Sequence, residues 1–288
     1  MKTIAIASGK GGTGKTFIST NLYKLMLDKN INVALADVDV EEPNSLLFFK
    51  EAKESTYKVV DEFRPDIQTD KCTFCGKCAE WCNYNAIMVI PRMKKITLID
   101  DLCHGCQACQ FACEYGAILP SKTDIGKVTS FIYDNKINLF EGKMIISKSS
   151  ATPVIKETIK IAKNHDNYEY LILDSPPGTS CPFIQTSVRA DYVILVAEPT
   201  PFGISDLRQS IETLKDLKIS YGIVINKCDL GDNKLKEYLA EENAEIISEI
   251  PFSKDIAHDY SVGNIASNTD TVREYFTNII NKLETLWK

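Results

Sequence analysis

The sequence predicts an α/β fold with a doubly wound, mostly parallel sheet, into which a second, α+β domain is inserted. Apolar stretches typical of buried strands alternate with helical patterns over most of the chain, and a cysteine-rich stretch interrupts the alternation. The expected strands cover residues 2–8, 31–37, 169–174, 192–197, 219–226 and 245–250. The expected helices lie near residues 15–29, 152–164, 204–217, 233–243 and 270–286. Two further short strands, 128–133 and 143–146, have no assigned place.

The composition is that of an ordinary globular protein. Of the 288 residues, 44% are hydrophobic and 25% are charged, which allows a closed core. Acidic residues outnumber basic ones by 39 to 33, and the resulting net charge of −6 repels phosphate backbones, so nucleic acid is not an expected partner. No apolar run is long enough to span a membrane or to serve as a signal peptide, so we expect a cytoplasmic protein.

The first expected strand leads into a glycine-rich loop and then a helix. The loop reads Gly9-Lys10-Gly11-Gly12-Thr13-Gly14-Lys15-Thr16 and matches the phosphate-binding pattern G-x4-G-K-[ST]. In such a loop the backbone N–H groups surround the phosphates, Lys15 reaches the β and γ oxygens, and Thr16 coordinates Mg²⁺. The sequence therefore predicts a nucleoside triphosphate site with Mg²⁺. The alternative is a glycine-rich turn without a ligand.

Eight of the ten cysteines form two groups with the same spacing, C-x2-C-x2-C-x3-C, offset by 31 residues. This spacing offers three thiolates from one loop to one [4Fe-4S] cluster, and the fourth to the other cluster. We therefore expect a first cluster on Cys72, Cys75, Cys78 and Cys113, and a second on Cys103, Cys106, Cys109 and Cys82. The alternatives are zinc and disulfides, but neither accounts for a duplicated set of eight.

The cysteine segment resembles a bacterial two-cluster ferredoxin. It departs from that family at Asn83 and Glu114, where the family usually has proline. The segment is bounded by prolines near residues 65 and 120, which divides the chain into an ATPase part at 1–62, an inserted ferredoxin domain at 63–120 and a second ATPase part at 121–288. Two clusters would add about −4 to the net charge, so we expect a redox or metallocluster partner with a basic patch.

The extra lysine of the loop, Lys10, carries a second resemblance. The run K-G-G-T-G-K-T resembles the deviant Walker A ATPases of the MinD/ParA/Mrp and nitrogenase iron protein superfamily. That resemblance implies a dimer that sandwiches ATP, formed with a second copy or with a paralogue, in which Lys10 reaches the nucleotide of the opposite subunit. It also implies slow ATP hydrolysis that a partner stimulates. The alternative for Lys10 is a solvated loop residue.

Acidic residues follow two of the expected strands. Asp37 and Asp39 resemble the family's switch I, which implies that Asp37 supports Mg²⁺ and that Asp39 orients the attacking water. Asp174 begins a run that ends at Gly178 and resembles Walker B and switch II of the Mrp branch. This implies that Asp174 holds Mg²⁺ through water and that the Gly178 N–H senses the γ-phosphate. Acidic residues at strand ends can also be simple helix caps.

The residues that would contact the base allow two readings, guanine or adenine. Asn226-Lys227-Cys228-Asp229 reads as the N-K-x-D guanine signature, which keeps GTP open through Asp229. In the superfamily resembled, an asparagine at the position of Asn226 contacts adenine, and the segment around Pro251 and Phe252 closes over the base.

Two features invite comparison with individual branches of the superfamily. The last helix has an apolar face like the membrane-targeting helix of MinD, but acidic residues dilute the polar face, so packing on the core is the expected role. Cys181 follows switch II at the offset of a nitrogenase iron protein ligand, but no second cysteine accompanies it, so a buried thiol is expected.

Taken together, the patterns predict a P-loop ATPase that couples its nucleotide state to electron transfer through two [4Fe-4S] clusters. An ATPase of metallocluster assembly, or a regulatory or positioning switch with a sensory ferredoxin, is the alternative. A GTPase switch is a third reading, and it depends on Asp229 alone.

Overall fold

The computed structural model describes residues 1–146, 148, 150–165 and 168–287. Its main sheet has nine strands in the order β11-β10-β9-β1-β8-β2-β7-β6-β3. The strands are β1 (Lys2–Ala7), β2 (Val33–Asp37), β3 (Lys53–Ile67), β6 (Ile118–Tyr133), β7 (Lys136–Met144), β8 (Tyr170–Asp174), β9 (Tyr192–Ala197), β10 (Tyr221–Asn226) and β11 (Ile246–Ile250). The strands from β11 to β7 run parallel, and β6 and β3 add an antiparallel edge.

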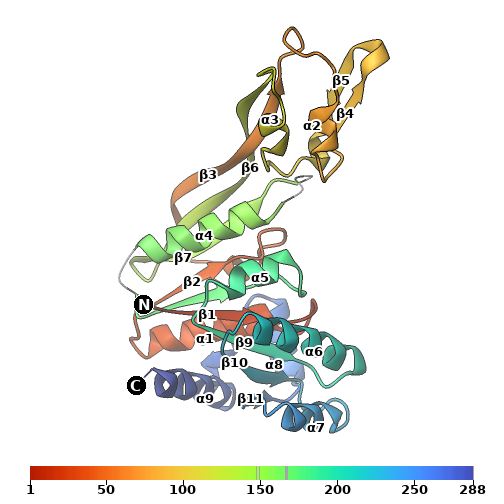
Figure 1. Ribbon diagram of the computed structural model, residues 1–288. Coiled ribbons are helices and arrows are strands. Elements are labelled where there is room, and N and C mark those ends of the chain that lie inside the picture. Colours follow the sequence, from red (N-terminus) through yellow and green to blue (C-terminus); the bar gives the residue numbers. More distant parts are fainter. Residues whose placement is uncertain (147, 149, 166–167, 288) are drawn as a thin grey trace.

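Helices cover both faces of the parallel part (Figure 1). One face carries α4 (Thr152–His165), α5 (Cys181–Ser187), α6 (Pro201–Asp216) and α7 (Lys234–Glu241). The other face carries α1 (Lys15–Asp28), α8 (Lys254–Ser261) and α9 (Asp270–Leu286). Strands buried on both faces read as continuous apolar runs, as in β9, where all six residues are buried. The expected doubly wound fold is confirmed.

The last helix, α9, packs on the core as its apolar face predicts. Val272, Phe276, Ile279, Ile280 and Leu283 are buried against α1 and the sheet. The aromatic rings of Phe276 and Phe17 meet edge to face with centroids 5.6 Å apart. Among the described residues, no helix is long and apolar enough to cross a membrane.

The edge strands β3 and β6 are long and extend beyond the sheet as a two-stranded stem (Figure 1). The stem carries a small lobe with α2 (Lys77–Glu80), the hairpin of β4 (Ile87–Ile90) and β5 (Lys95–Leu98), and α3 (Ala108–Phe111). Cys78, Ile87, Cys109 and Ile118 form the buried core of this lobe. The boundaries proposed at 62/63 and 120/121 fall inside β3 and β6, so the sheet continues into the insert without a break.

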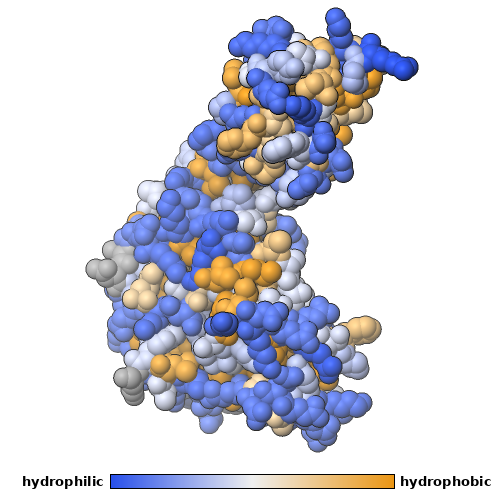
Figure 2. Space-filling view, in the orientation of Figure 1, coloured by the Kyte–Doolittle hydropathy of each residue, from blue (hydrophilic) through white to orange (hydrophobic). Residues whose placement is uncertain are grey.

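The two strands that sequence reasoning could not place join the main sheet. Residues 128–133 form the end of β6, whereas the strand expected at 143–146 begins at Lys136 and ends at Met144. The reason is a tight hairpin at Asp134 and Asn135, whose φ angles of 51° and 61° are left-handed, as a type I′ turn requires. Figure 2 shows hydrophilic side chains over much of the visible face, which is hollowed between the lobe and the ATPase body.

Candidate functional site

The phosphate-binding loop connects β1 to the first turn of α1. Gly14 precedes the helix with a φ of 102°, a left-handed conformation that glycine adopts most readily. A Cβ atom at this position would collide with Nδ2 of Asn226, which donates a 2.8 Å hydrogen bond to the carbonyl of Thr13. Asn226, at the end of β10, therefore holds the loop in place.

A cavity of about 460 Å³ opens over this loop. Nine of the predicted site residues line it: Gly11, Gly12, Gly14, Lys15, Thr16, Asp39, Asn226, Pro251 and Phe252. Thr13 is buried beneath the loop, and its hydroxyl has no hydrogen-bond partner in the described part of the chain. Residues from the loop, from the ends of β2 and β10 and from the segment after β11 thus surround one space.

Two buried carboxylates lie side by side at the ends of parallel strands, where Asp37 of β2 is in register with Asp174 of β8. Both Asp37 oxygens accept backbone N–H groups: Oδ1 from Asp39 at 3.1 Å, and Oδ2 from Asn44 and Ser45 at 2.9 and 2.8 Å. Burial raises the pKa of Asp37 well above its usual range, and the charge of Asp174 adds to this. Asp37 therefore anchors the loop that follows β2.

Asp174 offers a free oxygen to the site. Its Oδ2 accepts the Ser45 hydroxyl at 2.8 Å, whereas its buried Oδ1 has no hydrogen-bond partner among the residues described. Burial raises the pKa of Asp174, while the hydroxyls of Thr16 and Ser45 and the charge of Lys15 oppose the shift. Mg²⁺ prefers carboxylate and hydroxyl oxygens, so Asp174 and Thr16 fit such an ion. The oxygens of Asp37 are already engaged.

Lys15 and Asp39 face the same cavity. Burial lowers the pKa of Lys15, while Asp174 and Asp39 oppose that shift. Burial and the charge of Asp174 raise the pKa of Asp39 to about 6, against the opposing effect of Lys15. Asp39 is thus a carboxylate that changes charge near neutral pH at the edge of the cavity.

Lys10 lies outside the cavity and contacts its own chain. Its Nζ is 3.7 Å from Oε2 of Glu198 and 3.5 Å from Oγ1 of Thr200. The other Glu198 oxygen is 2.6 Å from Nζ of Lys227. Glu198 therefore contacts two lysines, one in the phosphate-binding loop and one directly after β10.

Gly178 also lies away from the cavity lining. Its φ is 90°, and its N–H donates a 3.1 Å hydrogen bond to the carbonyl of Ser8. The N–H that the resemblance assigns to the γ-phosphate is engaged with the chain itself in this structure.

A hydrogen bond connects the segments after β10 and β11, which are expected to contact the base. The carboxylate of Asp229 accepts the backbone N–H of Phe252 at 2.6 Å and does not line the cavity. This bond positions the Pro251–Phe252 segment, which closes one wall. Asp229 is therefore engaged in shaping that wall.

Sequence reasoning missed two residues of this site. Tyr260 of α8 lines the cavity, and burial and the charge of Asp174 raise its pKa while a hydrogen bond with Thr16 opposes the shift. Ser45 lies in the loop after β2 and holds both carboxylates, through its N–H and its hydroxyl. No spacing rule predicts either residue, because the chain brings them to the loop through tertiary contacts.

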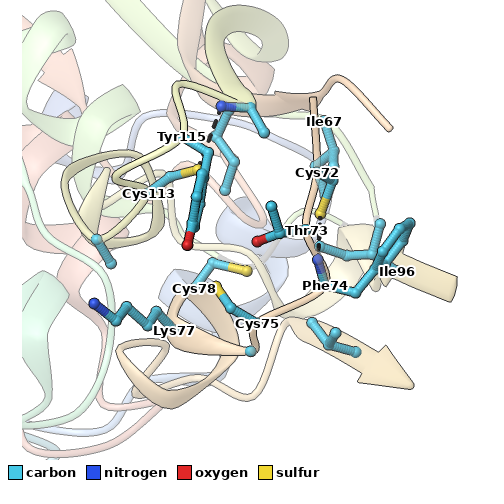
Figure 3. Close-up of a pocket in the computed structure, with 15 residues that line it drawn as sticks. Ile67, Cys72, Thr73, Phe74, Cys75, Lys77, Cys78, Ile96, Cys113 and Tyr115 are labelled. Carbon is cyan, nitrogen blue, oxygen red and sulfur yellow. Dashed lines mark hydrogen bonds between the residues drawn. The ribbon is translucent and has the colours of Figure 1, made fainter. Parts of the chain in front are cut away.

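The cysteines of the first expected set line a second cavity, in the inserted lobe. Cys72, Cys75, Cys78 and Cys113 come together from two segments around a small cavity of about 20 Å³ (Figure 3). The side chains of Tyr115, Ile96 and Ile118 are among the others that line it. Backbone N–H groups point at two of the sulfurs: Phe74 donates to Cys72 at 3.4 Å and Ala117 to Cys113 at 3.3 Å.

The second expected set lines a third cavity, also of about 20 Å³. Cys82, Cys103, Cys106 and Cys109 surround it, and Phe63 and Pro65 of β3 close its base. The backbone repeats with the offset of the sequence: the φ angles of Phe74 and Gly105 are 56° and 62°, and α3 repeats α2. The lobe is therefore a structural duplication with two equivalent cradles.

The donor sets fit [4Fe-4S] clusters. None of the ten cysteines is in a disulfide bond, so the disulfide alternative finds no support. In the described chain no three His, Cys, Asp or Glu side chains are close enough to hold a single metal ion. A zinc site needs its ligands around one ion, whereas four cysteine thiols per cavity match a [4Fe-4S] cluster in the number and kind of ligands.

The remaining cysteines lie apart from these cradles. Cys181 begins α5 and is exposed, so the expectation of a buried thiol was wrong. The cause is its place at the first turn of a short helix, which leaves the side chain at the surface. Cys228 is half-buried near Asp229.

Comparison with known proteins agrees with the fold. Residues 4–264 match the family model of the CobQ/CobB/MinD/ParA nucleotide binding domain. The chain is 31% identical to the uncharacterized protein MJ0579 of Methanocaldococcus jannaschii over 98% of this chain and 97% of that protein. It is 21% identical to an iron-sulfur cluster carrier protein of Pyrococcus abyssi, over 86% of this chain and 73% of that one.

Solved structures show the same architecture. The septum site-determining protein MinD of Pyrococcus horikoshii, complexed with Mg-ADP, superposes with a TM-score of 0.58 at 17% identity, over 99% of this chain and 96% of that one. At this identity the likeness concerns the fold. The family match covers most of the sheet and the whole phosphate-binding loop, and the chain belongs to the CobQ/CobB/MinD/ParA family of nucleotide-binding ATPases.

Proposed function

We propose that this ATPase couples its nucleotide state to electron transfer through two [4Fe-4S] clusters. The observation that carries the proposal is that each crossed set of four cysteines lines its own cavity, in a lobe whose two strands continue the ATPase sheet. The strand β3 leaves the ATPase body shortly after the Asp37–Asp39 segment. A conformational change around the nucleotide would therefore reach the lobe through the chain between Asp39 and β3.

The nucleotide of this proposal is ATP with Mg²⁺. Lys15 would bind the β and γ oxygens, and Thr16 and Asp174 would hold the ion, directly or through water. Asp39, at the cavity edge, would orient the attacking water. Asp229 is engaged with the Phe252 N–H, which removes the group that would recognise guanine. The aromatic and apolar wall formed by Phe252 and Ile256 suits the face of an adenine.

Lys10 would act in a dimer. Its ammonium group lies outside its own cavity, on the surface near Glu198, so it is available to a second chain only after the contact with Glu198 opens. A cation that arrives with the partner would supply charge stabilisation during phosphoryl transfer, as arginine fingers do. The partner is a second copy or a paralogue.

The cysteine cradles would hold the clusters, and each bound cluster would take up and release one electron. The chain contributes four thiolates per cluster and N–H donors to sulfur from Phe74, Ala86 and Ala117. N–H donors and burial are among the factors that tune cluster potentials. Cys75 and Cys106 are the exposed members, one per cradle, and mark where an electron would enter or leave.

A second candidate function is metallocluster assembly, because a relative is named an iron-sulfur cluster carrier protein. A carrier needs clusters that it can release. Cys78, Cys103 and Cys109 are each only 8% exposed, which favours resident clusters over transferable ones.

The test is anaerobic purification followed by EPR-monitored potentiometry, with and without MgATP. A change in midpoint potential on adding MgATP, absent in Lys15→Ala, supports coupling. Clusters that ignore MgATP in a protein that still hydrolyses it count against coupling. Iron that transfers readily to an apo-protein acceptor supports the carrier function instead.

A further inference from the structure

A buried arginine stands beside the second cysteine cradle. Arg64, on β3, has only 6% of its side chain exposed, although it carries a full charge at all accessible pH values. Its Nη1 donates a 2.5 Å hydrogen bond to the carbonyl of Cys103, one of the four cysteines of that cradle. Its neighbours along β3, Phe63 and Pro65, line the cavity itself.

The charged groups around Arg64 are arranged in a small network. Nε of Arg64 lies 3.1 Å from Oδ1 of Asp100, and Nη1 lies 3.5 Å from Oε1 of Glu62. Oδ2 of Asp100 lies 3.4 Å from Nζ of Lys148, which comes from the segment before α4. Two cations and two carboxylates thus balance, and the network joins the stem, the cysteine loop and the ATPase domain.

The hydrogen bonding of this network is incomplete. A guanidinium needs partners for its N–H groups when it is buried, yet Nη2 of Arg64 has none among the described residues. Buried charges with incomplete hydrogen bonding stabilise a fold poorly, because desolvation of the charges offsets their attraction, and the Asp100 side chain, 54% exposed, is partly screened by solvent. A nearby group that gains negative charge would change this balance, and a cluster gains negative charge when it is reduced.

Among the described residues we find no such buried arginine at the first cradle. The charged contact there is Lys77 with Glu114, and both side chains are largely exposed. Solvent screens such a pair strongly. The two cradles are therefore equivalent in backbone and cysteines but different in buried charge.

We propose that Arg64 is a positioning residue that raises the reduction potential of the second cluster relative to that of the first. The inference rests on the proposed function, because it presupposes the two clusters. A buried cation next to the Cys103 backbone favours the reduced cluster, which is the more negative form. Asp100 opposes Arg64, since its carboxylate lies in the same network.

The experiment compares the potentials of the holoprotein in the absence of nucleotide. Arg64→Gln removes the cation, and we expect the equilibrium constant for one-electron reduction of the second cluster to fall about tenfold, or about 59 mV. Asp100→Asn removes a negative charge and should shift the same cluster in the opposite direction. Arg64→Lys keeps the charge and should shift it less than Arg64→Gln.

The control is Lys122→Gln, which removes an exposed cation paired with Asp61 on the same stem. It should leave both potentials unchanged. Cys106→Ser identifies the signal of the second cluster, because it removes a ligand from that cradle alone. A merely structural role for Arg64 would not give shifts of opposite sign for the two charge-removing variants.

Two outcomes would overturn the inference in different ways. If the wild-type protein lacks about eight iron atoms per chain and the EPR signals of reduced clusters, the proposed function fails and this inference with it. If the clusters are present but Arg64→Gln and Asp100→Asn leave the second potential unchanged, or move it in the same direction, the role of Arg64 alone is refuted.

Discussion

The ammonium group of Lys10 lies 3.7 Å from the carboxylate of Glu198 within the same chain. The lysine that the family resemblance assigns to a partner's nucleotide is thus held by an internal contact. Glu198 also binds Lys227 at 2.6 Å, so the pair belongs to a three-residue group at the mouth of the site. Dimerisation through Lys10 would have to break this contact.

Replacing Glu198 by glutamine should therefore favour the ATP-bound dimer. Partly exposed ion pairs contribute about 0.2–1 kcal/mol, so the dimerisation constant should rise about 1.4-fold to fivefold. Sedimentation of the protein with a non-hydrolysable ATP analogue measures this constant. In the double variant with Lys10→Ala the effect should disappear, and a weaker dimer in Glu198→Gln would contradict the role given to this contact.

The pKa of Asp39, raised to about 6 by burial and by Asp174, predicts the pH dependence of ATP hydrolysis. If the ionised carboxylate orients water, kcat/KM should fall as the pH drops below about 6. Asp39→Asn should not show this fall in kcat/KM at acidic pH, and its rate should be about 10²–10⁴-fold lower than that of wild type. A steady-state profile between pH 5 and 8 tests both points.

The raised pKa of Asp39 also predicts how the stability of the fold depends on pH. A carboxyl whose folded pKa lies above its unfolded value of 3.8 binds more protons when folded, so its contribution to stability falls as the pH rises from about 4 to about 6. Asp39→Asn should therefore melt at a higher temperature than wild type at pH 7, in the absence of nucleotide. A lower melting temperature would show that the Asp39 carboxylate stabilises the fold.

Tyr260 predicts a competition with magnesium. Its side chain lines the cavity, and its pKa responds to Thr16 and Asp174, the two residues that fit Mg²⁺. Tyr260→Phe removes the competing hydroxyl, and since one hydrogen bond contributes about 0.5–1.5 kcal/mol, MgATP should bind about 2–13-fold more tightly. Calorimetric titration measures this, with ATP in EDTA as the control that should not change. Weaker MgATP binding would mean that Tyr260 contacts the nucleotide itself.

The bond between Asp229 and Phe252 predicts the outcome of a specificity test. Asp229→Ala should release the Pro251–Phe252 wall and weaken ATP binding about 2–13-fold, by the loss of one hydrogen bond. We expect a low GTP affinity in wild type and no increase in this variant. A selective loss of GTP binding in this variant would restore the guanine-binding role of Asp229.

The parts of the molecule that follow local rules could be predicted from sequence, and the parts set by distant contacts could not. The phosphate loop lies in one short segment, and the cysteines lie in two segments with the same spacing, so these patterns predict the grouping of Lys15 with Thr16 and of the crossed cysteines. The stem was missed because β3 is mostly exposed and contains Pro65, which reads as a strand end. The contacts of Arg64 with Asp100 and of Lys10 with Glu198 join segments far apart in the chain, and no spacing encodes them.

The last prediction concerns the route from nucleotide to cluster. The backbone N–H of Met144 donates to the carbonyl of Val40, next to Asp39, at 2.8 Å. A few residues later Lys148 reaches Asp100, which contacts Arg64 beside the second cradle. A rearrangement at Asp39 can thus move one positive charge relative to that cradle.

Lys148→Met should therefore at least halve the MgATP-dependent shift in the potential of the second cluster, measured as the difference with and without nucleotide. Lys122→Met, which removes an exposed lysine from the same stem, should keep the full shift. ATP binding itself should be unaltered in both variants, because neither lysine lines the nucleotide cavity. A full shift in Lys148→Met would exclude this route and leave the continuous strands of the stem as the connection between the two sites.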